Sequence, residues 1–141
     1  MNDTTKNDSL RDLGILMIRL ILAAVFLYHG SQKLFGMFGG YGISGTAGFF
    51  EKNLGIPFPY LSAIMAALAE FVGGLSLLTG IYLRWAMVPL RITMLVAAFS
   101  AHTGFGSQTG GMEYPLTLAI SAAGLGLIGA GRFAIQLPKR G

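Results

Sequence analysis

The sequence predicts an all-α integral membrane protein, a four-helix bundle with a short interfacial helix in its first outer loop. Hydrophobic residues make up 53% of the 141 residues, charged residues only 11%, and the mean hydropathy is +0.63. A soluble domain of this size needs a mostly polar surface, which this composition cannot supply. The chain also divides into four apolar runs, each near the roughly 20 residues with which a helix crosses a bilayer. These runs leave no room for a separate soluble domain.

The first span is predicted over residues 13–35, after a polar and cytoplasmic tail at residues 1–12. That tail mixes acidic with basic residues and so lacks the purely basic start of a secretory signal. The apolar run that follows is too long for the core of a signal peptide. We therefore expect this run to be a retained membrane span, ended by Gly36 and the glycines after it.

A short helix on the membrane surface is expected within the connection that follows the first span. Thr46 can cap its start, and the segment AGFFEKNL at residues 47–54 places its apolar side chains on one side. Gly55 and Pro57 are the stop signals.

The remaining spans are predicted at residues 60–79, 83–102 and 112–130. Gly80 ends the first of them, and Pro89 interrupts the second, where it can kink the helix just before Arg91. The last span follows a glycine-rich loop, TGFGSQTGG, and ends in the sequence GAGR. The domain assignment is therefore a four-span unit at residues 13–136 with a basic cytoplasmic tail at 137–141.

The distribution of Lys and Arg predicts the orientation. With four spans, the two termini and the turn between the second and third spans share one side of the membrane. That side holds Lys6, Arg11, Arg84, Arg132, Lys139 and Arg140. The opposite side holds Lys33 and Lys52. Because positive charge is retained in the cytoplasm, both termini are expected to be cytoplasmic.

Three charged residues lie inside the predicted spans, where a lone charge is costly and has to face the bundle interior. At 1.5 Å per residue, Arg19, Glu70 and Arg91 fall at nearly the same depth. We predict that the glutamate lies between the two arginines in an inner polar layer. Such a cluster can hold the helices in register, or its excess positive charge can serve a ligand.

A second polar layer is predicted near the outer boundary. His29, Gln32 and Lys33 occupy positions i, i+3 and i+4 of the first span and therefore share one face. His102 and Glu113 bracket the glycine-rich loop at the same depth. These residues could line a pocket that opens toward the outer face or the outer leaflet.

Several segments of the sequence resemble the DoxX family of small four-helix bacterial membrane proteins. The most specific are HGSQK at residues 29–33 and EFVGG at 70–74, and GGMEYPLTLA and GAGRF agree with them. The resemblance covers nearly all of residues 14–136. It implies a four-helix fold in the bacterial plasma (inner) membrane. Arg91, in a stretch that is usually apolar, and Gln136, where an Asp is common, depart from the family pattern.

The resemblance implies a range of possible activities and no single one. Members of the family have been linked to the membrane subunit of thiosulfate:quinone oxidoreductase and to redox-stress complexes with sulfurtransferase and superoxide dismutase partners. The first hypothesis is therefore a quinone-interacting subunit of a redox system. In it His29, Gln32 or His102 donates a hydrogen bond to a quinone carbonyl, and Glu70 or Glu113 handles the coupled proton. Glu70 and His102 are the candidate catalytic residues.

Two alternatives stay open. In the redox hypothesis Arg19 and Arg91 would stabilise reduced, anionic forms of a quinone, whereas a small-anion carrier would use the same arginine pair to bind its substrate. No internal inverted repeat supports a carrier. The other alternative is a non-catalytic membrane scaffold for a redox-stress complex, in which the polar residues only fix the fold.

The amino-acid composition limits which cofactors and partners can be expected. The chain has no cysteine, so any redox chemistry needs a bound cofactor or a partner, such as a soluble redox protein or a second membrane subunit. The His and Glu residues show no dense ligand spacing, and we predict no metal site. The formal charge of +4 is scattered at the ends of apolar runs, which favours contact with the lipid bilayer over nucleic acid. Small-residue faces are compatible with a homo-oligomer.

Overall fold

The computed structural model describes residues 3–135 and 137, and every regular element in that part of the chain is helical. The elements in order are α1 (Asp3–Phe35), η1 (Met37–Gly39), α2 (Gly42–Phe49), η2 (Phe50–Leu54), α3 (Pro59–Thr79), α4 (Leu83–Ser100), η3 (Ser107–Thr109) and α5 (Glu113–Ile128). Short 3₁₀ turns form η1 and η3, whereas η2 is a single π-helical segment. The prediction of an all-α chain is confirmed.

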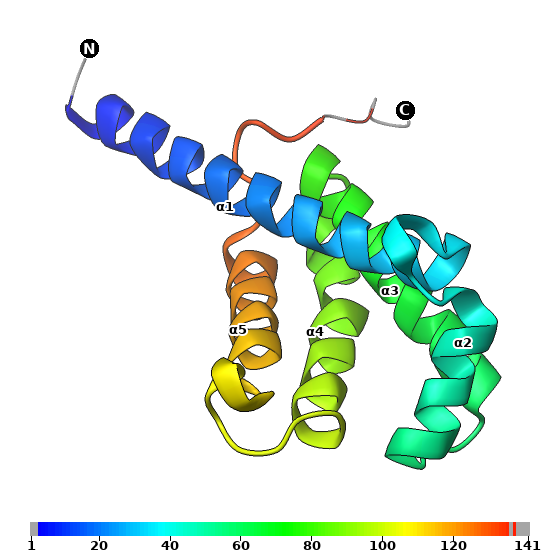
Figure 1. Cartoon of the computed structure of the whole chain (residues 1–141). Helices are drawn as coiled ribbons and strands as arrows, with labels where there is room; N and C mark the ends of the chain where they lie inside the picture. The colour runs from blue at the N-terminus through cyan, green and yellow to red at the C-terminus, as the bar shows by residue number, and fades with distance from the viewer. Residues whose placement is uncertain (1–2, 136, 138–141) are drawn as a thin grey trace.

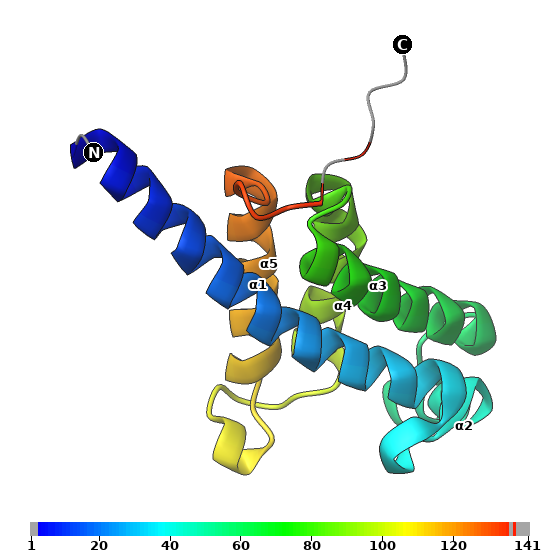
Figure 2. The same ribbon diagram turned by 90° about the horizontal axis from the view of Figure 1, so that it is seen from above.

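The helices pack as two antiparallel pairs. Figure 1 shows α4 and α5 side by side, joined by the glycine-rich loop, and α1 crossing the bundle obliquely. Seen from above in Figure 2, α1 and α3 run alongside each other in opposite directions, with α2 against the end of α1 and the start of α3. α3 also packs on α4, so it connects the two pairs.

Glycines set the close approach of α1 and α3. A methyl group at Gly30 of α1 would lie 2.6 Å from the backbone nitrogen of Phe71 in α3, and one at Gly74 would lie 2.9 Å from Leu27. Gly30 pairs with Phe71 and Leu27 with Gly74, and both pairs fit one antiparallel register of α1 and α3. The segments 29–33 and 70–74, which carry the sequence resemblance, therefore pack directly against each other.

Arg19, in the middle of α1, forms hydrogen bonds with the end of α3 and with the segment that follows α5. Its side chain is fully buried, and its Nε donates a hydrogen bond to the Leu77 carbonyl at 2.9 Å. One terminal nitrogen donates to the Leu78 carbonyl at 3.2 Å and the other to the Ala130 carbonyl at 2.7 Å. The last carbonyls of a helix have no partner within the helix and carry negative partial charge, so a guanidinium suits this position. Arg19 thus ties α1 to the end of α3 and to the segment after α5.

Gly80 completes this junction. It follows α3 in a left-handed conformation with φ of 81°, and its N–H donates to the Ser76 carbonyl. A side chain here would collide with both Ala134 and the Arg19 guanidinium, at 2.5 and 2.9 Å. The prediction that Gly80 ends this helix is confirmed, and the reason includes the space that Arg19 needs.

Several predicted element bounds differ from the structure. The polar segment at residues 1–12 is helical from Asp3, so α1 extends well before the predicted start at residue 13. α3 starts one residue before the predicted 60–79, α4 ends two before the predicted 102, and α5 covers Glu113–Ile128 where 112–130 was expected. For α3, α4 and α5 these are differences of one or two residues, which are common at the ends of helices. Gln136 and the basic tail, apart from Leu137, lie outside the described residues.

The predicted cap at Thr46 is wrong. α2 already begins at Gly42, and Thr46 is buried inside it. The glycines before it allow the chain to turn earlier than a capping argument assumes. The stop at Gly55 is confirmed, since Gly55 has φ of 62° and its N–H donates to the Phe50 carbonyl.

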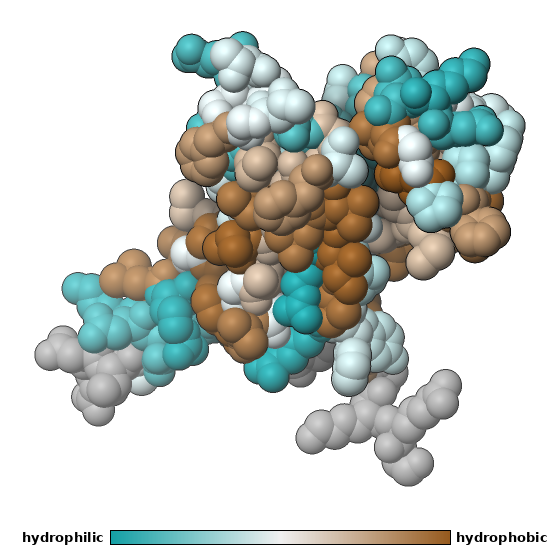
Figure 3. Space-filling model, turned by 90° about the horizontal axis from the view of Figure 1, so that it is seen from below, coloured by the Kyte–Doolittle hydropathy of each residue, from teal (hydrophilic) through white to brown (hydrophobic). Residues whose placement is uncertain are grey.

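The surface of the bundle is apolar. By length and composition two helices in the described part of the chain, α3 and α4, could cross a membrane, and α5 is apolar but shorter. Large hydrophobic side chains are exposed along these helices, among them Met65 at 63%, Phe99 at 69% and Leu127 at 78%. Figure 3 shows the hydrophobic residues across the middle of one face, with hydrophilic residues gathered at its margins. Such continuous apolar exposure suits a lipid environment.

Replacing Arg19 by Met should destabilise the fold. The change removes the donor of one buried hydrogen bond, to Leu77, and of two part-buried ones, to Leu78 and Ala130. An unsatisfied buried acceptor costs about 1–3 kcal/mol. Unfolding by SDS in mixed micelles, followed by circular dichroism, measures the loss. Arg91→Met is the matched control, because Arg91 is half-buried and has no polar partner among the described residues. Equal stability of the two variants would contradict the anchoring role of Arg19.

The two kinds of helical glycine should also respond differently to alanine. Gly30→Ala drives a methyl group into the Phe71 backbone and should destabilise the bundle by about 1–3 kcal/mol. Gly124→Ala in α5 meets no atom within 4 Å, so it should be neutral or stabilising by up to about 1 kcal/mol through helix propensity. The same SDS titration distinguishes them, and a tolerated Gly30→Ala would show that α1 and α3 can separate freely.

Candidate functional site

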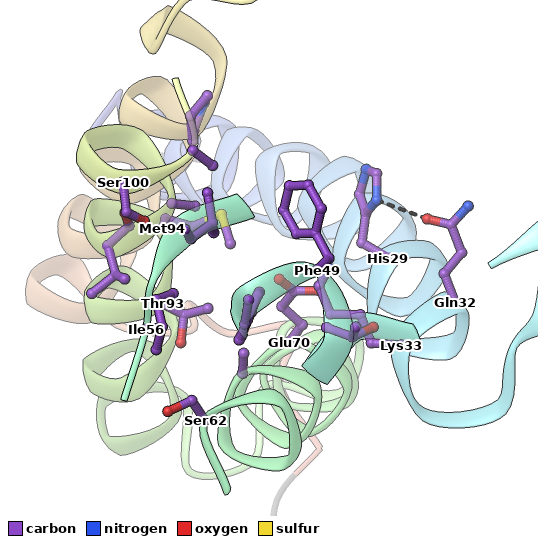
Figure 4. Close-up of a pocket in the computed structure, with 18 of the residues that line it drawn as sticks. His29, Gln32, Lys33, Phe49, Ile56, Ser62, Glu70, Thr93, Met94 and Ser100 are labelled. Carbon is purple, nitrogen blue, oxygen red and sulfur yellow. Dashed lines mark hydrogen bonds and ion pairs between the residues drawn. The ribbon is translucent and has the colours of Figure 1, made fainter. Parts of the chain in front are cut away.

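The candidate site is a cavity of about 790 Å³ enclosed by α1, α2, η2, α3 and α4, with the start of α5 at one edge. It lies at the end of the bundle where α1 and α4 finish and where α3 and α5 begin. Most of its lining is apolar, and Figure 4 shows polar side chains gathered mainly on the α1 and α3 side. We call His29, Gln32, Lys33 and Glu70 the polar wall. A cavity of this size and character is typical of a site for a small organic ligand.

An ion pair forms the centre of the polar wall. The Lys33 Nζ lies 2.7 Å from Glu70 Oε2, joining the last turns of α1 to the middle of α3. The side chain of Glu70 is only 3% exposed, whereas that of Lys33 is 25% exposed. The carboxylate is therefore held away from solvent with its charge balanced by a more accessible ammonium. Lys33 is a pocket residue that pairs with Glu70, in addition to its predicted place near the outer boundary.

His29 and Gln32 form the second contact of the polar wall. The His29 Nδ1 lies 3.1 Å from Gln32 Oε1, and Gln32 Nε2 donates to the Phe38 carbonyl at 3.4 Å. With this amide orientation the histidine nitrogen has to be the donor, since an amide oxygen only accepts. A neutral His29 then presents Nε2 as an acceptor. An edge-to-face contact with the Tyr28 ring further limits rotation of the His29 ring.

His102 lies at the end of α4 and also lines the cavity. Its Nδ1 lies 2.7 Å from the Ala97 carbonyl, an obligate acceptor, so Nδ1 carries the hydrogen. Neutral His102 therefore also offers Nε2 as an acceptor, and it becomes a donor through Nε2 only when protonated. The predicted donation from His102 to a quinone carbonyl would therefore have to come from Nε2 of the protonated ring.

The predicted inner layer is wrong. Glu70 pairs with Lys33 and not with Arg19 or Arg91, and the Arg19 guanidinium is occupied by backbone carbonyls. Neither arginine lines the cavity. The equal-depth estimate fails as well, because Arg19 bonds the end of α3 whereas Glu70 pairs with Lys33, several turns further along α1. The arginine pair on which an anion carrier would depend does not form.

Glu113 is also outside the cavity. One of its carboxylate oxygens accepts a hydrogen bond from the Ser107 N–H at 2.7 Å, within the glycine-rich loop. It stabilises the turn before α5. Four residues of the predicted outer layer, His29, Gln32, Lys33 and His102, are thus brought to one cavity together with Glu70.

Three hydroxyl side chains of the cavity lining were not predicted from the sequence. Ser62, Thr93 and Ser100 line the cavity, and each donates to a carbonyl of its own segment. Figure 4 places Thr93 and Ser100 on α4, across from Lys33 and Glu70. Their spacing on α4 was a usable signal, because residues seven apart share one face. The register of Gly30 and Gly74 could likewise have indicated the Lys33–Glu70 pair.

Comparison with known proteins identifies the family of this chain. The DoxX family model matches residues 14–103, which include α1 from Gly14 onward, α2, η2 and all of α3 and α4. The chain belongs to the DoxX family. Both segments that define the polar wall, 29–33 and 70–74, lie inside the matched range.

Relatives of known name span nearly the same length. The "Inner membrane protein YqjF" of Escherichia coli (strain K12) is 29% identical over 129 residues, covering 90% of this chain and 92% of the relative. The "Putative oxidoreductase CatD" of Bacillus subtilis (strain 168) is 27% identical over 125 residues, covering 89% and 86%. No solved structure matches. With its apolar exposed surface, this DoxX-family chain is a membrane protein.

Removing Lys33 should reveal the coupling within the polar wall. Lys33→Met leaves the Glu70 carboxylate buried and unpaired, which costs about 3–5 kcal/mol. The double variant Lys33→Met with Glu70→Leu should recover most of that loss, because no charge stays behind. A double-mutant cycle on SDS unfolding measures the difference, and simple additivity of the single variants would show that the two groups do not interact.

Proposed function

We propose that this DoxX-family protein is a quinone-interacting membrane subunit of a redox system, of the thiosulfate or oxidative-stress type. The observation that carries the proposal is the cavity of about 790 Å³, apolar over most of its surface and polar at Lys33 and Glu70. A quinone head group is a planar, largely apolar ring with carbonyl oxygens that accept hydrogen bonds. Its size and its polarity both suit this cavity.

The proposal includes a four-span topology. In it α1, α3, α4 and α5 cross the bacterial plasma membrane, and both termini are cytoplasmic. Lys6 and Arg11 near the start of α1 and Arg84 in the first turn of α4 support this orientation. The cavity then lies in the outer half of the membrane, within reach of lipid-soluble molecules.

The structure suggests a division of roles among the residues. Lys33, the more exposed member of the ion pair, can donate a hydrogen bond to a carbonyl oxygen in the cavity. The Nε2 atoms of His29 and His102 are acceptors in the neutral rings and can hold the hydroxyl group of a reduced product. A quinone bound here supplies the acceptor for electrons and protons. Glu70, buried and paired, is the group placed to receive or release a proton beside it.

The electrons have to come from elsewhere, because the chain carries no cysteine and its described residues hold no cluster of three or more metal-ligating side chains. We therefore include a soluble redox partner or a second membrane subunit in the proposal. The name of the Bacillus subtilis relative, which calls it an oxidoreductase, is consistent with a redox context.

A non-catalytic adaptor is the second candidate function. The observation in its favour is that the members of the polar wall already satisfy one another, Lys33 with Glu70 and His29 with Gln32. In that case the wall holds α1 against α3, and the cavity contains lipid.

Purified protein in a mild detergent should retain quinone, which organic extraction and mass spectrometry identify. Addition of thiosulfate or of a partner extract should yield quinol. Glu70→Gln and His102→Ala should lower that rate on the order of 100-fold or more, as loss of a general acid or base does. Asp8→Asn, on the polar start of α1, is the carboxylate control and should leave the rate unchanged.

The readings of that experiment separate the candidates. Circular dichroism has to show both pocket variants folded, so that lost activity reports chemistry. If the purified protein yields no quinone in any detergent, the redox function is rejected and the adaptor is favoured.

The topology can be tested with single cysteines, since the natural chain has none. Asn53→Cys in η2 should react with a membrane-impermeant maleimide in intact cells, because it faces outward in the proposed orientation. Asn7→Cys in α1 should react only after the cells are permeabilised. The reverse pattern of labelling would invert the topology.

A further inference from the structure

The cavity is polar on one side and opens to lipid-facing side chains on another. The polar wall belongs to α1 and α3, whereas Ile92 and Val96 of α4 line the cavity and are 53% and 49% exposed. Lining residues with this much exposed surface mark the place where the cavity is open to its surroundings. The opening beside α4 is therefore apolar.

The opposite edge of this opening is formed by η2 and the residue stretch after it. Leu54 and Ile56 line the cavity, and both are half-buried. Figure 3 shows a recess between the lobe at the upper right, on the side where α2 and η2 lie in Figures 1 and 2, and the rest of the bundle. We call the space between these residues and Ile92 and Val96 of α4 the mouth. It is bordered by aliphatic side chains on both edges.

The segment that covers the cavity is joined to the bundle through glycines. The cover consists of α2 and η2, residues 42–54. It begins at Gly42 and is followed by Gly55, with φ of 65° and 62°. Gly36 and Gly39 before it also have positive φ. η2 is π-helical, a conformation that is rare and recurs at functional sites. Both ends of the cover are thus joined to the bundle through glycines in the left-handed conformation, where the backbone has the most conformational freedom.

We infer that the ligand of this cavity is a lipid-soluble amphiphile with an aliphatic tail, which enters sideways from the bilayer through the mouth between η2 and α4. This inference rests on the proposed quinone function and specifies its substrate class. The head group lies against Lys33 and Glu70, and the tail passes between Ile56 and Ile92 into lipid. An apolar mouth admits such a molecule without desolvating a charged group, whereas a polar solute would have to cross aliphatic side chains.

A crosslink across the mouth tests the path. Cysteines replace Ile56 and Ile92 in the otherwise cysteine-free chain, and a short, reducible bifunctional maleimide joins them in proteoliposomes. Exchange of a radiolabelled long-tailed quinone should then slow on the order of tenfold or more, as when binding needs a blocked conformational change. Reduction of the linker should restore the rate. The control carries cysteines at Ile120 and Leu127, both exposed on α5, where the linker joins only one helix to itself.

Tail dependence is measured on the same protein without the linker. A long-tailed quinone should displace the bound label at a concentration at least about tenfold lower than a tailless analogue of the same head group, since each buried methylene favours binding. Equal potency of the two analogues would overturn the inferred substrate class. Unchanged exchange after complete crosslinking would overturn the lateral path, while bound quinone would still support the proposed function. Absence of bound quinone in the linked and the unlinked protein would overturn both.

Discussion

The guanidinium of Arg19 is the interaction on which the rest of this bundle depends. It reaches from the middle of α1 to carbonyl groups at the end of α3 and in the segment after α5. Between helices in lipid the hydrophobic effect supplies little attraction, so hydrogen bonds and close packing decide how helices associate. A fully buried cation that satisfies the carbonyls of two chain segments fixes where α1 can lie. Gly80 leaves the space that this arrangement needs.

From that anchor the register of α1 and α3 extends toward the cavity. Gly74 receives Leu27, Gly30 lies on Phe71, and about one turn further Lys33 reaches Glu70. The contacts succeed one another along two antiparallel helices, with a polar contact at each end and glycines between. The polar wall of the cavity is therefore a consequence of the packing that begins at Arg19. The wall is closely packed on the α1 and α3 side, while the cover on the other side is bounded by glycines.

The Lys33–Glu70 pair links stability to the proposed chemistry. A buried carboxylate needs a partner, and Lys33 supplies it while retaining some exposure to the cavity. The same contact that holds the two helices in register places a donor and a proton acceptor beside an apolar space. The histidines follow a similar principle, because the bond that each Nδ1 makes determines what its Nε2 can do. In this bundle structural hydrogen bonds set the chemical character of the groups that face the cavity.

The sequence by itself determined the helical class, the approximate position of each helix and the membership in the DoxX family. These depend on local properties, namely apolar runs, glycine stops such as Gly80, and motifs such as HGSQK. It also grouped His29, Gln32 and Lys33 correctly, since positions three and four apart share a helix face. Tertiary structure alone decided the partners of Arg19 and Glu70, the exclusion of Arg91 and Glu113 from the cavity, and the early start of α2. A fixed rise per residue measures distance within one helix, but a side chain's level and partner depend on the register, rotation and crossing of whole helices, which close contacts such as Gly30 on Phe71 establish.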